Sequence, residues 1–134
     1  MMKRGRGRIV TIASAFGKTG GHGFITAYAA SKHGVVGLTR ALAAELGSQG
    51  YPGITVNAIC PGYVRAGLGI KTQSTKAGPM SGTEIFERYY KRQVPLRRMI
   101  EAGEVAHAAV FLALPDSGAI TGQALNVDGG FVMS

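Results

Sequence analysis

The fold is decided by residues 8–59, RIVTIASAFGKTGGHGFITAYAASKHGVVGLTRALAAELGSQGYPGITVNAI, which hold two β-branched runs around a long helical pattern. The runs at residues 8–13 and 53–59 are short and apolar, as in strands of a buried parallel sheet. Residues 15–23 contain too many glycines for a helix or a strand, so we expect a loop there. A strand, a helix and a strand at this spacing predict a right-handed parallel crossover.

The central pattern predicts a helix from Thr26 to about Leu46, because apolar residues recur at spacings of three and four. Gly47 follows directly and is the expected C-terminal stop. The residues expected on the buried face are Val35, Leu38, Leu42 and Leu46.

Three further elements are expected downstream of a long aperiodic segment, residues 63–82, which we interpret as a substrate-binding flap. Residues 83–92 predict a short helix, residues 101–114 a second one, and residues 123–127 a third strand. The resulting order is β-α-β-α-β. It predicts an α/β fold that corresponds to one mononucleotide-type half of a doubly wound, Rossmann-like parallel sheet.

Composition limits the possible classes. The chain has 134 residues, 46% of them hydrophobic and 16% charged, which predicts one folded domain. One cysteine, Cys60, excludes an internal disulfide, argues against a metal cluster and favours a reducing compartment such as the cytoplasm. No apolar run reaches the length of about 20 residues that a membrane span needs. The basic and then apolar start imitates a secretion signal, but its apolar part is short and contains Thr11 and Ser14.

Tyr28 and Lys32 are four residues apart near the start of the predicted long helix, so their side chains share one face. An ammonium beside a phenol favours the phenolate, and such a pair suits proton exchange near neutral pH. Ser14 ends the first predicted strand and could donate to a carbonyl or alkoxide oxygen. The alternatives are a surface tyrosine with a solvated lysine, and a loop-start serine that bonds its own backbone.

Four segments carry a resemblance to the short-chain dehydrogenase/reductase family. They are GRIVTIAS at 7–14, YAASKHGVVGLT at 28–39, VNAICPG at 56–62 and ITGQALNVDGG at 120–130. Their order is that of the family, and together they extend over nearly the whole chain. Within the family, the sequence looks most like 3-oxoacyl-carrier-protein reductases, polyketide ketoreductases and polyol or hydroxybutyrate dehydrogenases.

The resemblance implies a catalytic set and a cofactor. Tyr28 would exchange a proton with the substrate oxygen, Ser14 would hold that oxygen, and Lys32 would favour the phenolate and bind the nicotinamide ribose. The remaining residues implied in binding NADP or NAD are Asn57, Pro61, Gly62 and Val64. Ala66 stands where the family often has a threonine that contacts the cofactor, which removes one hydrogen bond.

The resemblance also implies that residues 1–134 are a single partial domain, the C-terminal, catalytic and substrate-binding half, without the N-terminal cofactor-binding half. No G-x-G-x-x-G occurs in the sequence. The expected substrate is a small carbonyl or alcohol compound that could be acyl-carrier-bound. The expected partner of the complete protein is a further copy of itself, with no nucleic acid and no membrane.

Three other functions compete with this interpretation. Gly17-Lys18-Thr19 imitates a phosphate-binding loop, but Ile12 stands where that motif needs its first glycine. The formal net charge of +8 suggests a nucleic-acid-binding module, although the basic clusters lack interleaved stacking aromatics. A non-catalytic interaction or assembly module is the third alternative.

Overall fold

The computed structural model describes all residues except His22 and Phe24. A three-stranded parallel sheet, in the order β1-β2-β5, forms its centre. The strands are β1 (Gly7–Ile12), β2 (Ile54–Pro61) and β5 (Ala124–Val127). The predicted α/β class and all three predicted strands are therefore confirmed, with shifts of one or two residues at their ends.

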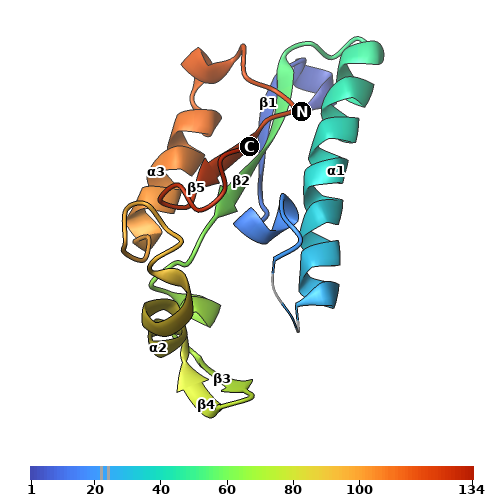
Figure 1. Ribbon diagram of the computed structural model, residues 1–134. Helices are drawn as coiled ribbons and strands as arrows, with labels where there is room; N and C mark the ends of the chain where they lie inside the picture. The colour runs from blue at the N-terminus through green and yellow to red at the C-terminus, as the bar shows by residue number, and fades with distance from the viewer. Residues whose placement is uncertain (22, 24) are drawn as a thin grey trace.

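Two helices sandwich this sheet (Figure 1). They are α1 (Thr26–Ser48), which packs mainly on β2, and α3 (Ala102–Ala113), which contacts all three strands. Between β2 and α3 the chain forms a small hairpin, β3 (Thr72–Thr75) and β4 (Gly78–Ser81), and then the short helix α2 (Gly82–Ile85). Figure 1 shows the hairpin and α2 projecting away from one end of the sheet.

Short helical turns complete the chain. In the described part of the chain, four are 3-10 turns, at Met2–Arg4, Ala15–Gly17, Gly67–Gly69 and Pro115–Ser117, and Phe86–Tyr90 forms a π-helical turn after α2.

The strand register brings the carboxyl ends of β1 and β2 together. Ile9 lies opposite Val56 and Ile12 opposite Ile59, while β5 joins the other side of β2 with Ala124 opposite Ala58. Parallel strands all point the same way, so the residues that follow them gather at one edge of the sheet. Ligands of open α/β sheets bind at this edge.

Helix α1 continues past Gly47, the predicted stop, and ends at Ser48. Gly47 is therefore an interior residue of the last turn. Gly50 is the glycine with the left-handed backbone, at φ +82°, and Tyr51 donates its N–H to Leu46 at 2.9 Å across that turn. The positive φ that stops a helix is thus adopted three residues later than expected.

The buried face of α1 also differs from the prediction at one position. Leu38 is 60% exposed, whereas Val36 and Thr39 are buried against the sheet. Thr39 is satisfied there because its Oγ1 lies 2.9 Å from Thr11 Oγ1 and donates to Val35 O at 2.8 Å. A polar residue that is hydrogen-bonded on the sheet therefore faces the core in place of a leucine.

The segment expected to be irregular, residues 63–82, contains the β3–β4 hairpin. Strand β3 consists of Thr, Gln and Ser and is mostly exposed, while β4 contains Gly and Pro and is partly buried, so neither strand shows the apolar alternation by which a strand is identified. Gly78, at φ +98°, closes the turn. The expected helix at 83–92 is present as α2 and the π-helical turn, and it begins with a capping box between Ser81 and Glu84.

Two ion pairs attach the segment between β2 and α3, residues 63–100, to the start of α3. This whole segment, which includes the predicted flap at residues 63–82, is called the flap below. Arg65 Nε lies 3.0 Å from Glu101 Oε1, and Arg98 Nη2 lies 2.7 Å from Glu104 Oε1. Val64 also forms a parallel bridge with Ile100, so the two ends of the flap meet.

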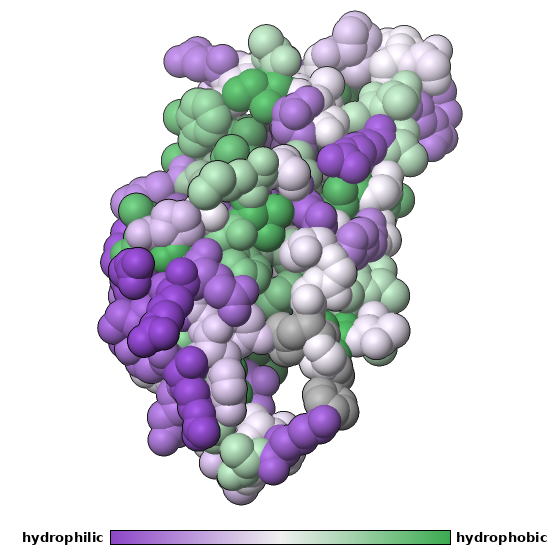
Figure 2. All heavy atoms as spheres, in the orientation of Figure 1, coloured by the Kyte–Doolittle hydropathy of each residue, from purple (hydrophilic) through white to green (hydrophobic). Residues whose placement is uncertain are grey.

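Surface character varies along the molecule. Figure 2 shows apolar side chains at the surface over the sheet and α3, and hydrophilic ones gathered over the flap. Within the described chain, no strand pairs with the outer edge of β1, although its sequence is that of a buried strand. The exposed apolar residues around the sheet and α3 include Ile12, Val110, Phe111, Leu114 and Leu125.

Glu104 makes the stability of the fold sensitive to acid. Its hydrogen bonds with the Arg98 guanidinium, and then with the main-chain N–H of Glu101, lower the pKa of its carboxyl from 4.5 to about 2. A carboxyl with a depressed folded pKa stabilises above the unfolded pKa, and this contribution is lost as pH falls through the folded value. We expect Glu104→Gln to lower the urea midpoint at neutral pH, with the difference from wild type vanishing between pH 4.5 and about pH 2. A pH-independent difference would contradict this role.

Gly17 allows the turn after β1 to pack against α1. A Cβ placed on Gly17 would lie 2.7 Å from the main-chain oxygen of Lys32. We expect Gly17→Ala to lower the free energy of unfolding by about 1–3 kcal/mol, the usual cost of overpacking. The matched control is Gly37→Ala, where a Cβ meets nothing within 4 Å and helix propensity should raise stability by roughly 0.5–1 kcal/mol. Urea unfolding measures both, and equal effects would refute the close approach.

Candidate active site

Ser14 lies two residues after the end of β1 and directly before the Ala15–Gly17 turn. It is 5% exposed, and its Oγ accepts a hydrogen bond from the main-chain N–H of Phe16 at 3.1 Å. It is thus the cap of the Ala15–Gly17 turn, which is the backbone-bonding alternative considered above. A hydroxyl that accepts one bond still has its own proton to donate, so this geometry is compatible with the donor role that the sequence predicts for Ser14.

Tyr28 and Lys32 lie on the first two turns of α1, as the four-residue spacing predicts. Lys32 Nζ is 5.8 Å from the centre of the Tyr28 ring, and it donates to the main-chain oxygen of Ile12 at 3.1 Å. Tyr28 is 38% exposed and hence accessible to a substrate. One ammonium therefore connects the Tyr28 helix with the end of β1, two residues before Ser14.

Pro61, Gly62 and Val64 follow β2 at the same edge of the sheet. Gly62 donates its N–H to Val127 O at 3.1 Å, and a Cβ there would lie 2.9 Å from Cα and Cβ of Asp128. Only glycine therefore fits between the ends of β2 and β5. The structure thus brings these three residues to the edge where Ser14 and Lys32 lie.

Asn57 lies apart from that edge, in the middle of β2 and opposite Val10. It is 1% exposed, its Nδ2 donates to Ile120 O at 2.8 Å, and its Oδ1 accepts from Gln123 N at 3.0 Å. Its amide therefore connects β2 to the loop that leads into β5. The structure does not bring the Asn57 side chain to the group formed by Ser14, Tyr28 and Lys32.

Five aromatic side chains form a cluster beside the site that sequence reasoning did not predict: Phe16, Tyr63, Phe86, Tyr90 and Phe131. Tyr63 lies at its centre, with ring centroids 4.3 Å from Tyr90, 5.7 Å from Phe86 and 6.0 Å from Phe16. Phe16 belongs to the loop after β1 that contains Ser14, called the Ser14 loop below. Tyr63, Phe86 and Tyr90 belong to the flap, and Phe131 belongs to the turn after β5, called the C-terminal turn below. No sequence spacing connects them, so only the tertiary structure reveals the cluster.

The tyrosine pair in this cluster is neutral at physiological pH. Burial, with a smaller contribution from the hydrogen bond to Tyr90, raises the pKa of Tyr63 far above its ordinary value. The Tyr28 phenol is close enough to add to this shift. Burial also raises the pKa of Tyr90. The aromatic cluster therefore provides Tyr28 with an uncharged and largely apolar neighbour.

The segment Gly17-Lys18-Thr19, which imitates a phosphate-binding loop in the sequence, has another role in the structure. Lys18 Nζ donates to Ala124 O and to Asn126 Oδ1, both at 3.0 Å. A phosphate-binding lysine needs an ammonium that faces its ligand, whereas this one is bonded to β5. The geometry therefore disfavours a phosphate loop at this position.

Other functional features are few in the part of the chain that the structure describes. No group of three His, Cys, Asp or Glu side chains there could hold a metal ion. No helix there combines the length and the hydropathy of a membrane span. Cys60 is buried, and burial raises the pKa of its thiol above the ordinary 9.0, which makes it a poor nucleophile.

Several known proteins are similar to this chain in sequence and in fold. A putative ketoacyl reductase of granaticin polyketide synthase from Streptomyces violaceoruber is 47% identical over 132 residues, and the match covers 97% of this chain and 47% of that protein. A 3-oxoacyl-[acyl-carrier-protein] reductase from Haemophilus influenzae is 41% identical, with 100% of this chain and 50% of that protein covered. The chain thus spans about half the length of these curated relatives.

Solved structures of reductases and dehydrogenases have the same fold over nearly the whole of this chain. A crystal structure of an actinorhodin polyketide ketoreductase variant with NADPH matches with a TM-score of 0.82 and 44% identity, over 98% of this chain and 49% of that one. A putative 2-deoxy-D-gluconate 3-dehydrogenase from Agrobacterium tumefaciens with bound NADP matches with a TM-score of 0.75 and 36% identity, over 97% and 48%. The family model described as enoyl-(acyl carrier protein) reductase matches residues 1–132. With these matches extending over nearly its whole length, the chain belongs to the short-chain dehydrogenase/reductase family.

Proposed function

We propose that this chain carries the proton-transfer and substrate-binding part of an NAD(P)-dependent reductase that interconverts a carbonyl and a secondary alcohol. The observation that supports the proposal is that Lys32 lies beside the exposed ring of Tyr28 and bonds to Ile12 at the end of β1, two residues before Ser14. Family membership supports the reaction class. The relatives span about twice this length, so the activity of the complete protein is part of the proposal.

Each of the three side chains has a distinct role in the proposed reaction. Tyr28 donates its phenolic proton to the carbonyl oxygen as that oxygen gains negative charge, and takes the proton back in the alcohol oxidation. Ser14 donates a hydrogen bond to the same oxygen with the proton that its Phe16 contact leaves available. The Lys32 ammonium stabilises the phenolate that remains after transfer, while its bond to Ile12 fixes its position.

The residues present fit the nicotinamide end of an NAD(P) cofactor. NADPH or NADP is bound in similar solved structures; the reduced form would supply the hydride for carbonyl reduction, and the oxidised form would accept it in the alcohol oxidation. Here Lys32 would hold the ribose hydroxyls, and Pro61, Gly62 and Val64 would line the nicotinamide pocket. The Gly62 backbone meets Asp128 closely, which gives that wall a fixed shape. Asn57, proposed from the family resemblance as a cofactor residue, would act here by holding β2 on the β5 loop.

The pyrophosphate end of the cofactor has no matching feature in this sequence, which lacks a G-x-G-x-x-G. We therefore propose that a cofactor-binding half adds its sheet to the open outer edge of β1. The exposed apolar residues near that edge and on α3 would be covered by this half and by further copies of the protein in a homo-oligomer.

We propose a 3-oxoacyl compound bound to a carrier as the substrate. The relatives named above include a ketoacyl reductase and a 3-oxoacyl-[acyl-carrier-protein] reductase. The flap exposes Arg88, Arg92 and Arg97, and such a basic surface attracts an acidic carrier. The reduced, buried thiol of Cys60 is consistent with the cytoplasm as the place of this reaction.

A non-catalytic assembly module is the second candidate function, and the open edge of β1 is the observation that favours it. The two candidates differ in one respect. An assembly module binds a partner through that edge but has no use for the phenol of Tyr28.

Tyr28→Phe tests the proposed function. The assay combines this chain with the cofactor-binding half of the granaticin relative, the part of that protein that the present chain does not match. We expect the variant to lose turnover of acetoacetyl-CoA by about 100-fold or more, because proton transfer is removed, and to keep its affinity for NADPH. Tyr51→Phe, which changes a tyrosine beyond the other end of α1, is the matched control and should keep full activity. Retained turnover in Tyr28→Phe would refute the assignment.

A further inference from the structure

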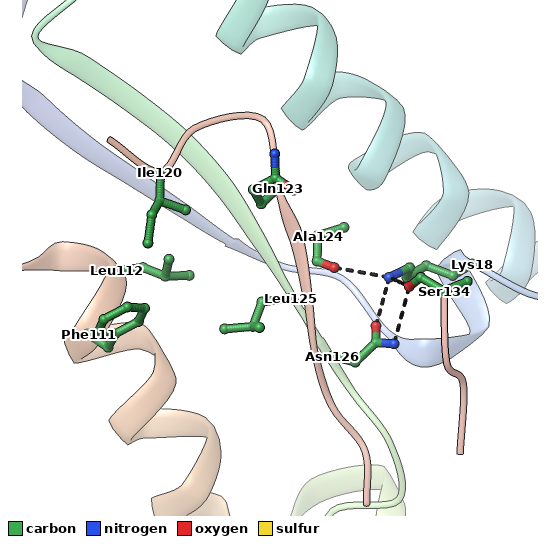
Figure 3. Close-up of a pocket in the computed structure, with 9 residues that line it drawn as sticks. All are labelled: Lys18, Phe111, Leu112, Ile120, Gln123, Ala124, Leu125, Asn126 and Ser134. Atoms are coloured by element: carbon green, nitrogen blue, oxygen red, sulfur yellow. Dashed lines mark hydrogen bonds between the residues drawn. The ribbon is translucent and has the colours of Figure 1, made fainter. Parts of the chain in front are cut away.

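The Lys18 side chain extends from the Ser14 loop to the edge of β5 that does not pair with β2. Its ammonium donates to Ala124 O and Asn126 Oδ1, both at 3.0 Å, and also to the main-chain oxygen of Ser134 (Figure 3). Since Ala58 N bonds to Gln123 O, the carbonyl of Ala124, one residue further on, faces away from β2. Lys18 thus binds the outer edge of the last strand. All three of its acceptors belong to the C-terminal part of the chain.

The turn that carries Lys18 is the turn that Ser14 begins. Lys18 donates its main-chain N–H to Ala15 O at 3.1 Å, and Gly17 donates to Ser14 O at 2.8 Å. On one side Gly17 lies directly against Lys32 of α1. On the other side, the Lys18 side chain attaches the turn to β5. The turn is therefore held between the two elements that flank it.

The same network continues into the C-terminal turn and the flap. Asn126 accepts from Lys18 with Oδ1 and donates with Nδ2 to Val132 O at 2.5 Å. Val132 N donates to Asp128 Oδ2 at 2.8 Å. Next to Asp128, Gly129 O accepts from Leu96 N of the flap at 3.1 Å. These hydrogen bonds, together with the covalent link between Asp128 and Gly129, connect the Ser14 turn with the substrate-binding segment.

We infer that Lys18 is a positioning residue for Ser14, through its bonds to β5 and the C-terminal turn. The inference rests on the proposed function, since it requires Ser14 to bond the substrate oxygen. Lys18 lies four residues from Ser14 and acts through the backbone of the turn. A hydrogen-bond donor must match the position of the developing oxyanion closely, so a loosened turn weakens that bond in the transition state more than it weakens cofactor binding.

A double-mutant cycle between Lys18→Met and Ser14→Ala tests this inference in the reconstituted reductase described above. We expect Lys18→Met to lower kcat by about 10- to 100-fold with little change in NADPH affinity. On the Ser14→Ala background, we expect the same change at Lys18 to have almost no further effect on kcat. Lys18→Arg should recover part of the rate, and Lys3→Met, a distant exposed lysine, should leave it unchanged. Additive losses, or an unchanged kcat in Lys18→Met, would overturn the inference.

A second readout needs only this chain and no activity. The N–H of Phe16 bonds to Ser14 Oγ, so its hydrogen exchange reports the order of the turn. We expect faster exchange at Phe16 in Lys18→Met, and also in Asn126→Leu, which removes one acceptor without touching the lysine. Unchanged exchange in both variants would overturn the inference. The proposed function fails separately, through turnover in Tyr28→Phe, whatever the result at Lys18.

Discussion

The pairing of β2 with a parallel strand on each side is the constraint on which the rest of this structure depends. All eight residues of β2 are buried. Its apolar residues Val56, Ala58 and Cys60 pack beneath α1, while the amide of Asn57 bonds the loop before β5. Because a buried backbone must have its hydrogen bonds made, β1 and β5 cannot shift register without leaving polar groups of β2 unpaired. The fixed register then determines which residues meet at the carboxyl edge of the sheet.

At that edge, two lysines hold the Ser14 loop through main-chain oxygens. Lys32 reaches from α1 to Ile12 at the end of β1, and Lys18 reaches from the turn to Ala124 on β5. Hydrogen bonds from a charged donor are stronger than neutral ones, which suits a loop whose glycines would otherwise leave it much conformational freedom. The aromatic cluster attaches the same loop to the flap. The candidate site therefore lies where the loop, the helix and the flap are all attached to a rigid sheet.

The sequence predicts those parts that local physics determines. The β-branched runs and the spacing of apolar residues predict β1, α1, β2 and α3, and the four-residue interval places Tyr28 and Lys32 on one helix face. The predicted burial of Leu38 is wrong, because tertiary packing decides how a helix is rotated about its axis. The predicted stop at Gly47 is wrong, because the end of the helix depends on which glycine adopts a positive φ, and here that is Gly50. The strands of the flap hairpin have no apolar alternation, so the sequence pattern does not predict them. The aromatic cluster brings together residues more than a hundred positions apart, such as Phe16 and Phe131, so no local spacing predicts it.

The central claim is that the chain holds the chemistry of a reductase but depends on a second half for cofactor affinity. Titration of NADPH by its fluorescence, with the chain alone and with the chain mixed with the cofactor-binding half of the granaticin relative, tests this claim most directly. The account predicts no saturable binding to the chain alone and saturable binding to the mixture that exceeds what the added half binds by itself. A dissociation constant of about 1 μM for the chain alone, roughly 8 kcal/mol of binding free energy, would contradict it.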